Sequence, residues 1–140
     1  MKKTIKWIAF ITWLIIIFIF SHQPNSGDTT HGIIENIIPI LKNSKWLDII
    51  NYIIRKLAHI TEYLILSLLT ISLMKEYTKK EKIIILFSIL FCFFYACTDE
   101  FHQSLIVGRT SKFTDALIDT VGSLIGIIIY KIKLNTKKDA

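Results

Sequence analysis

The chain contains four apolar stretches, which are separated by more polar segments. They cover residues 4–20, 57–74, 83–98 and 116–130. A helix needs about 20 mostly apolar residues to cross a bilayer, with a lower limit of about 17, so each stretch is short for a span. Residues 7–20 and 83–95 carry no charge on any side, whereas a helix of a soluble bundle keeps one polar face. The pattern therefore predicts four membrane-spanning helices.

The connection between the first two predicted spans, residues 21–56, also has a helical pattern. Its apolar residues recur every three or four positions in two sets, which are Ile33, Ile34, Ile37, Ile38 and Leu41, and then Trp46, Ile49, Ile50, Ile53 and Leu57. Pro39 interrupts the first set, whereas nothing between Asp48 and Leu57 ends a helix, so the second set can continue into the second span. We expect one or two interfacial amphipathic helices at the outer membrane surface, with Trp46 as an anchor. An ordinary solvated loop is the alternative.

The composition agrees with a helical membrane protein. Of the 140 residues, 52% are hydrophobic and 20% are charged, which excludes a disordered chain and argues against a soluble enzyme. Cys92 and Cys97 lie in the third predicted span, where we expect them to pack as small apolar residues. The first stretch resembles a signal peptide, but no small-x-small cleavage site follows it, so we expect a retained span. Residues 1–140 are predicted to form a single all-α membrane domain, a polytopic bundle of helices.

The net charge of +6 is a topology signal. Eleven of the 17 basic residues lie before or at the start of the first span, in the 75–82 connection and in the tail after residue 130. Because Lys and Arg are enriched in cytoplasmic segments, both termini and the 75–82 connection are predicted to be cytoplasmic. The same placement excludes a nucleic-acid interface. Eight of the 11 acidic residues lie at or beyond the outer ends of the spans, and acids contribute little to topology, so their placement needs another cause.

Polar side chains within the predicted spans recur every three or four residues, which places them on one face of each helix. These stripes are Lys56, His59, Tyr63, Ser67 and Thr70, with Glu62 beside them, on the second helix; Ser88, Cys92, Tyr95, Asp99, His102 and Gln103 on the third; and Asp115, Asp119, Gly122 and Gly126 on the fourth. The Gly-x-x-x-Gly spacing lets a neighbouring backbone approach closely, so this stripe should face the bundle. Ionisable groups in membranes usually face the interior and pair with one another. We therefore predict a polar cluster at the outer ends of these three helices.

Three chemistries fit the cluster. The leading one is binding of an anionic or amphiphilic ligand, with Arg109 and Lys56 meeting phosphate or carboxylate groups. The candidate ligand-binding residues in the cluster are Lys56, Tyr63, Gln103, Arg109, Asp115 and Asp119. The second is acid/base catalysis by a histidine that a carboxylate orients. Its candidate residues are His59, Glu62, Asp99, Glu100 and His102.

Metal binding is the third chemistry. His59 with Glu62, and Asp99 with His102, each supply a histidine and a carboxylate three residues apart, a spacing that bundle metal sites use. Lys56 and Arg109 would compete for the same carboxylates, and the sequence identifies neither a metal nor a cofactor. The non-functional alternative is a structural salt-bridge network among interfacial side chains.

At these residues the chain resembles the VanZ-like family of bacterial membrane proteins. The matching segments are Phe20-Ser21-His22-Gln23, Arg55-Lys56-Leu57-Ala58-His59-Ile60-Thr61-Glu62-Tyr63, Asp99-Glu100-Phe101-His102-Gln103, Gly108-Arg109, Asp115 and Asp119-Thr120-Val121-Gly122. The family often has asparagine where this chain has Asp119. The resemblance implies a four-span protein of the bacterial cell membrane, and it adds Ser21 and Gln23 to the candidate ligand-binding residues. It associates the family's namesake with low-level resistance to the glycopeptide teicoplanin and implies no reaction mechanism.

Three functions follow as hypotheses. In the first, the outer site binds or alters a lipid-linked cell-wall intermediate or another membrane lipid, so that a lipophilic glycopeptide engages its target less well; the antibiotic itself is a further candidate ligand. In the second, the protein is an intramembrane enzyme that acts on a lipid headgroup through histidine and carboxylate chemistry. In the third, it is a structural subunit whose segments 33–41 and 46–57 dock another membrane protein.

Overall fold

The computed structural model describes residues 2–41, 44–107 and 112–136, and these are almost entirely helical. Its elements are α1 (Lys3–His22), α2 (Ser26–Ile37), the 3-10 turn η1 (Pro39–Leu41), α3 (Lys45–Met74), α4 (Glu81–Ser104) and α5 (Phe113–Thr136). No strand occurs in these described ranges. The predicted all-α fold is confirmed.

The longest helix, α3, joins the predicted amphipathic segment 46–57 to the predicted span 57–74 in 30 residues. It begins after Ser44, whose Oγ accepts a hydrogen bond from the backbone N–H of Trp46 at 3.2 Å. Asp48 adds a negative charge to the first turn, where the helix dipole favours it. No glycine or proline interrupts residues 45–74. The prediction that this amphipathic segment continues into the span is therefore confirmed.

Three helices of the described chain, α1, α3 and α4, are long and apolar enough to cross a membrane, so the prediction of four was wrong in number. The fourth predicted span, residues 116–130, is helical within α5 but is not one of the three. Its charge-free run covers only residues 120–130, because Asp119 precedes it and Lys131 follows it. A spanning helix needs about 20 apolar residues, so α5 falls short on its own.

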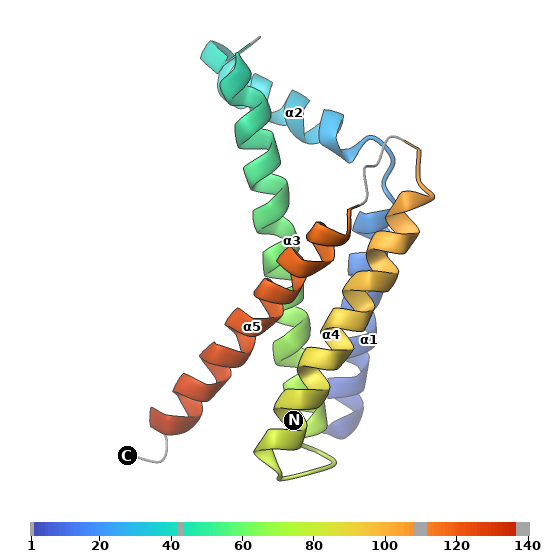
Figure 1. Cartoon of the computed structure of the whole chain (residues 1–140), viewed down its shortest axis with the longest axis vertical. Helices are drawn as coiled ribbons and strands as arrows, with labels where there is room; N and C mark the ends of the chain where they lie inside the picture. Colours follow the sequence, from blue (N-terminus) through green and yellow to red (C-terminus); the bar gives the residue numbers. More distant parts are fainter. Residues whose placement is uncertain (1, 42–43, 108–111, 137–140) are drawn as a thin grey trace.

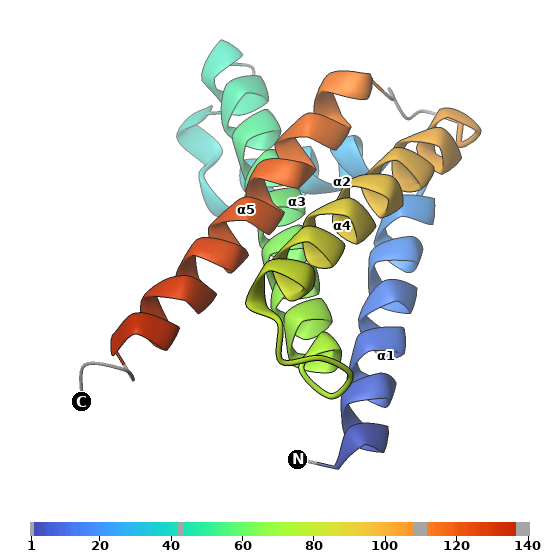
Figure 2. The ribbon, with the colours of Figure 1, turned by 60° about the horizontal axis from the view of Figure 1, so that its bottom comes forward.

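α3 is the central helix, and each of the other four α-helices packs against it. Figure 1 shows α5 crossing α3 obliquely, while α1 and α4 lie beside the lower part of α3. The first turn of α1, the last turn of α5 and the α3–α4 connection lie at one end of the bundle, at the bottom of Figures 1 and 2. α2 and the last turns of α4 lie at the other end. The bundle thus has two chemically different ends.

Side-chain hydrogen bonds fasten α1 to its neighbours, and two of them lie in the middle of the helix. The Trp13 Nε1–H donates to the carbonyl oxygen of Glu62 on α3 at 2.9 Å. The Tyr95 hydroxyl on α4 donates to the carbonyl oxygen of Leu14 at 2.9 Å. The middle of α1 is therefore attached to both α3 and α4.

The crossing of α3 and α5 is a backbone contact at the two glycines of the predicted Gly-x-x-x-Gly groove. A Cβ built on Gly122 would lie 2.3 Å from the carbonyl oxygen of Ile60, and one on Gly126 would lie 2.7 Å from the carbonyl oxygen of Leu64. No side chain fits in such a space, so only glycine permits this approach. The predicted close approach is confirmed, and it brings the first turns of α5 against the middle of α3.

Candidate functional site

Polar side chains of α3, α4 and α5 meet at the end of the bundle opposite the first turn of α1. On α4, Asp99, Glu100 and Gln103 are buried, and on α5 Asp119 is only 1% exposed. Asp119 precedes Gly122 by three residues, so the glycine contact with α3 also presses this carboxylate against α3. The three polar stripes converge as predicted.

Three carboxylates of the cluster have well-defined contacts. The Lys56 ammonium lies 2.7 Å from Asp115 Oδ1, and this ion pair bridges α3 and α5. The Gln103 amide donates to Asp99 Oδ2 at 3.0 Å within α4. The backbone N–H of Lys112 donates to Glu100 Oε2 at 3.1 Å, which attaches the segment just before α5 to α4. Together these contacts link the three helices around one polar centre.

The centre of the cluster is formed by His59, Asp99 and Asp119, one residue from each of the three helices. Each offers one nitrogen or oxygen ligand atom, and these atoms all lie within 4.8 Å of one another. His59 Nδ1 lies 3.5 Å from Asp119 Oδ1. Two buried oxygens beside this pair, Asp119 Oδ2 and the Tyr63 hydroxyl, have no hydrogen-bond partner in the described part of the chain. This group of donors could hold a metal ion.

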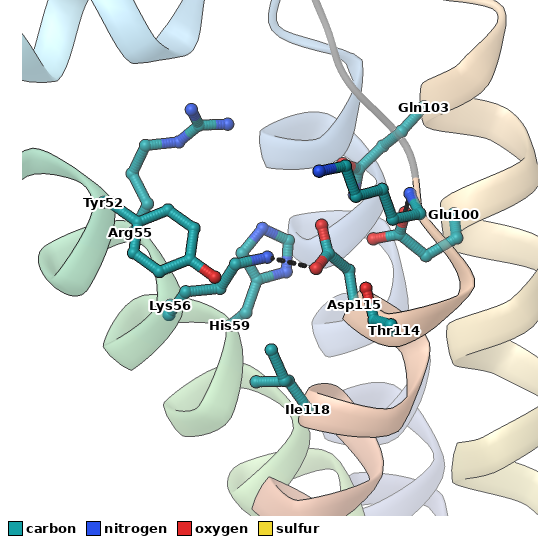
Figure 3. A pocket seen from close by; sticks show the side chains of 10 residues that line it. Tyr52, Arg55, Lys56, His59, Glu100, Gln103, Thr114, Asp115 and Ile118 are labelled. Carbon is teal, nitrogen blue, oxygen red and sulfur yellow. Dashed lines mark hydrogen bonds and ion pairs between the residues drawn. The ribbon is translucent and has the colours of Figure 1, made fainter.

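A cavity of about 250 Å³ opens between α3, α4 and α5 (Figure 3). Its polar lining comprises the cations Arg55, Lys56 and Lys112, the carboxylates of Glu100 and Asp115, and the side chains of His59, Gln103, Thr114 and Tyr52. Figure 3 shows Lys56 reaching across from α3 to Asp115 on α5, with Glu100 and Gln103 on the α4 side. Three cationic side chains around one cavity are suited to binding an anionic group.

A second cavity, also of about 250 Å³, lies toward α1 and α2. Its lining includes Gln23, Thr30 and Glu62. Arg55 and His59 line both cavities. These two side chains therefore stand between the two spaces, where each can contact a group that occupies either one.

Seven of the predicted site residues line these spaces, namely Gln23, Lys56, His59, Glu62, Glu100, Gln103 and Asp115. Tyr63, Asp99 and Asp119 are buried beside them, but His102 lies elsewhere. Its Nε2 lies 3.1 Å from Nδ1 of His22, and its ring stacks on Phe18 with centroids 4.6 Å apart, so it belongs to the contact between α1 and α4. The Ser21 hydroxyl, at the end of α1, is buried with no hydrogen-bond partner in the described ranges. Arg109, the predicted phosphate contact, lies outside the described residues.

The candidate metal ligands that the structure brings together differ from the pairs considered from the sequence. Those pairs were His59 with Glu62 and Asp99 with His102, each on one helix. The structure instead brings His59 together with Asp99 and Asp119 across three helices. Helix crossing, and not spacing along one helix, decides which donors meet.

The sequence reasoning missed two cationic residues of the main cavity, Arg55 and Lys112. Arg55 was quoted in a family motif without a role, although it is adjacent to Lys56 and one turn before His59. This spacing could have indicated that Arg55 lies at the same site as Lys56 and His59. Tyr52, whose ring centroid lies 5.5 Å from the Lys56 ammonium, was also missed, although it precedes Lys56 by one turn.

Comparison with known proteins identifies the family of the chain. The family model described as VanZ/LLP1 matches residues 6–134, which is nearly the whole chain. No curated protein and no solved structure matches the chain. The three apolar helices are those of a membrane protein, in agreement with this family. The resemblance read from the polar motifs is confirmed, and the chain belongs to the VanZ/LLP1 family.

Proposed function

We propose that this membrane protein binds the anionic headgroup of a lipid or lipid-linked cell-wall intermediate, and thereby contributes to envelope homeostasis or to glycopeptide resistance. The observation that carries the proposal is the cavity lined by Arg55, Lys56 and Lys112. A guanidinium and two ammonium groups bind phosphate oxygens through charge-assisted hydrogen bonds. The phosphate would replace Asp115 as the partner of the Lys56 ammonium.

The size and surroundings of the cavity favour a headgroup over a whole antibiotic. Pockets for drug-sized ligands measure roughly 300–1,000 Å³, and this cavity measures about 250 Å³. Nearby Leu57, Leu117 and Val121 are exposed and present apolar surface to acyl chains. An amphiphile can therefore keep its tails in the bilayer while its headgroup enters the cavity, and any effect on a glycopeptide would be indirect.

The distribution of basic residues supports an outer-leaflet position for the cavity. The lysine-rich first turn of α1, last turn of α5 and α3–α4 connection share one end of the bundle. The positive-inside rule places that end in the cytoplasm. The cavity lies at the other end, where lipid-linked cell-wall intermediates and glycopeptides meet the membrane.

Mass spectrometry of lipids that copurify with the detergent-solubilised chain tests the proposal. We expect a phosphate-containing lipid with the wild type and at least a tenfold loss of it in Arg55→Gln and Lys56→Gln. Lys75→Gln is the matched control, because Lys75 caps the other end of the same helix. Equal lipid content in all four proteins would refute the proposed ligand.

A susceptibility measurement tests the resistance part separately. Expression in a sensitive Gram-positive host should raise the inhibitory concentration of teicoplanin, which has a lipid tail, more than that of vancomycin, which has none. Lys56→Gln should abolish the difference at equal protein abundance. No change, or an equal change for both antibiotics, would refute the resistance role while leaving lipid binding to its own test.

One observation favours a second candidate, an enzyme acting on the headgroup. His59 lines both cavities, and its Nδ1 lies 3.5 Å from the Asp119 carboxylate. An imidazole that lines a cavity and has a carboxylate close to its other nitrogen can act as a general base once the two groups hydrogen-bond. Turnover of phospholipid or polyprenyl phosphate by the wild type, lost in His59→Gln, would support this function. Absence of any product with both substrates would reject it.

A further inference from the structure

The buried contact of His59, Asp99 and Asp119 has the composition and placement of a metal site. The three residues come from α3, α4 and α5, and their ligand atoms lie within 4.8 Å of one another. Ligands bound to one ion at about 2.0–2.2 Å lie roughly 3–3.5 Å apart. Small side-chain rotations would therefore bring the three atoms onto a common ion.

Two unpartnered oxygens point to a missing partner at this place. Asp119 Oδ2 and the Tyr63 hydroxyl are buried with no hydrogen-bond partner among the described residues, and their side chains are 1% and 0% exposed. Buried polar atoms are almost always satisfied by protein, water or an ion. Tyr63 follows His59 by one turn of α3, so its hydroxyl lies on the same face of the helix as the imidazole.

Asp119 also has other acidic side chains around it. Among the described residues, the acids Asp99, Glu100 and Glu62 and the cation Lys56 are near enough to act on its carboxylate. Lys56 in turn pairs with Asp115 at 2.7 Å. Several carboxylates gathered in a poorly solvated site repel one another unless a cation or protons compensate them.

We propose that His59, Asp99 and Asp119 bind a divalent transition-metal ion, with Zn²⁺ and Mn²⁺ as the ions that the donors suit. One imidazole nitrogen and two carboxylate oxygens are hard-to-borderline ligands that select these ions over Ca²⁺, which takes six to eight oxygens. Three protein ligands leave a coordination position open, and the Tyr63 hydroxyl can donate a hydrogen bond to a water in it. The ion also links three helices whose carboxylates otherwise repel one another.

Metal titration of the full chain tests this site without any lipid ligand. The detergent-purified protein is stripped with a chelator and titrated with Mn²⁺ alone, and free Mn²⁺ is followed by electron paramagnetic resonance. We expect one Mn²⁺ per chain, displaced by Zn²⁺, and at least tenfold weaker binding in Asp99→Asn and Asp119→Asn. Asp48→Asn is the matched control, because Asp48 lies in the first turn of α3, outside both cavities.

Thermal unfolding provides a second measurement, in which each protein is compared with itself with and without metal, so that a lower starting stability of a variant does not affect the result. An ion that binds only the folded state raises the melting temperature with its concentration. We expect Mn²⁺ to raise it in the wild type and Asp48→Asn but not in Asp119→Asn. The proposal would be overturned if neither ion changed the melting temperature of the wild type, or if Asp119→Asn bound Mn²⁺ as tightly as the wild type. Protons shared among the carboxylates would then compensate their charge.

Discussion

Gly122 lies where α5 crosses α3, and the backbone of α3 leaves no room for a side chain there. A Cβ on Gly122 would lie 2.3 Å from the carbonyl oxygen of Ile60 and 2.9 Å from its Cα. Favourable contacts between such atoms begin at roughly 3.5 Å, so α5 would have to move outward by about 1 Å. Both contacting atoms belong to the backbone, and no rotamer change can relieve the clash.

We therefore expect Gly122→Ala to destabilise the protein. Overpacking of this kind costs about 1–3 kcal/mol, and the higher helix propensity of alanine offsets about 0.5–1 kcal/mol of it. The net loss should be about 1–2 kcal/mol in the free energy of unfolding, measured in detergent by circular dichroism. Gly32→Ala in α2 is the matched control: its Cβ meets nothing within 4 Å, so it should gain about 0.5–1 kcal/mol.

Gly126→Ala provides a graded test of the same reasoning. Its Cβ would meet Ser67 Oγ at 2.1 Å, which can rotate away, and the carbonyl oxygen of Leu64 at 2.7 Å, which cannot. Its loss of stability should fall between those of the other two variants. If Gly122→Ala unfolds like the wild type, or if Gly32→Ala loses as much stability as Gly122→Ala, then backbone contact is not what holds α5 on α3.

Two ion pairs give further predictions. The side chains of Lys56 and Asp115 are 19% and 18% exposed, between the exposed and buried cases, so Lys56→Met should cost about 1–2 kcal/mol. Adding Asp115→Leu should restore most of that in a double-mutant cycle, and strict additivity would contradict the pairing. At the other end, the hydrogen bond and charge of Lys6 hold the pKa of Glu76 below its ordinary value. At a pH above the pKa of Glu76 in the unfolded chain, the pair contributes its full stabilisation. This contribution is lost as the pH falls through the lower pKa of Glu76 in the folded protein. The stability advantage of the wild type over Glu76→Gln should therefore vanish in acid.

Features that depend on neighbouring residues in the chain were predictable. The continuity of α3 follows from the lack of a glycine or proline in residues 45–74 and from the capping Ser44. The close approach of another helix to α5 follows from the spacing of Gly122 and Gly126, which removes side chains from one face of α5. Both depend on local sequence alone, and both were confirmed.

The pairing of side chains between helices was less accessible. Consecutive residues on a helix point about 100° apart, since there are 3.6 residues per turn. Gln103 therefore contacts Asp99, while the neighbouring His102 contacts His22 on α1. A spacing of three or four residues defines the polar face of a helix only to within about one residue, so it cannot distinguish these two directions. The sequence of α4 alone also does not reveal that α1 packs on the side of His102. The grouping of His59 with Asp119 likewise depends on the crossing of α3 and α5.

The features that weaken α5 as an independent span are the same ones that build the candidate site. Asp115 and Asp119 shorten its charge-free run to residues 120–130, and its glycines add little hydropathy. The same aspartates contact Lys56 and His59, and the glycine contact is what allows them to reach α3. A helix with so short an apolar run gains its position from a neighbouring helix and from satisfied polar groups as well as from lipid. The stability of α5 on α3 and the occupation of the polar site should therefore rise and fall together, because both depend on one set of contacts.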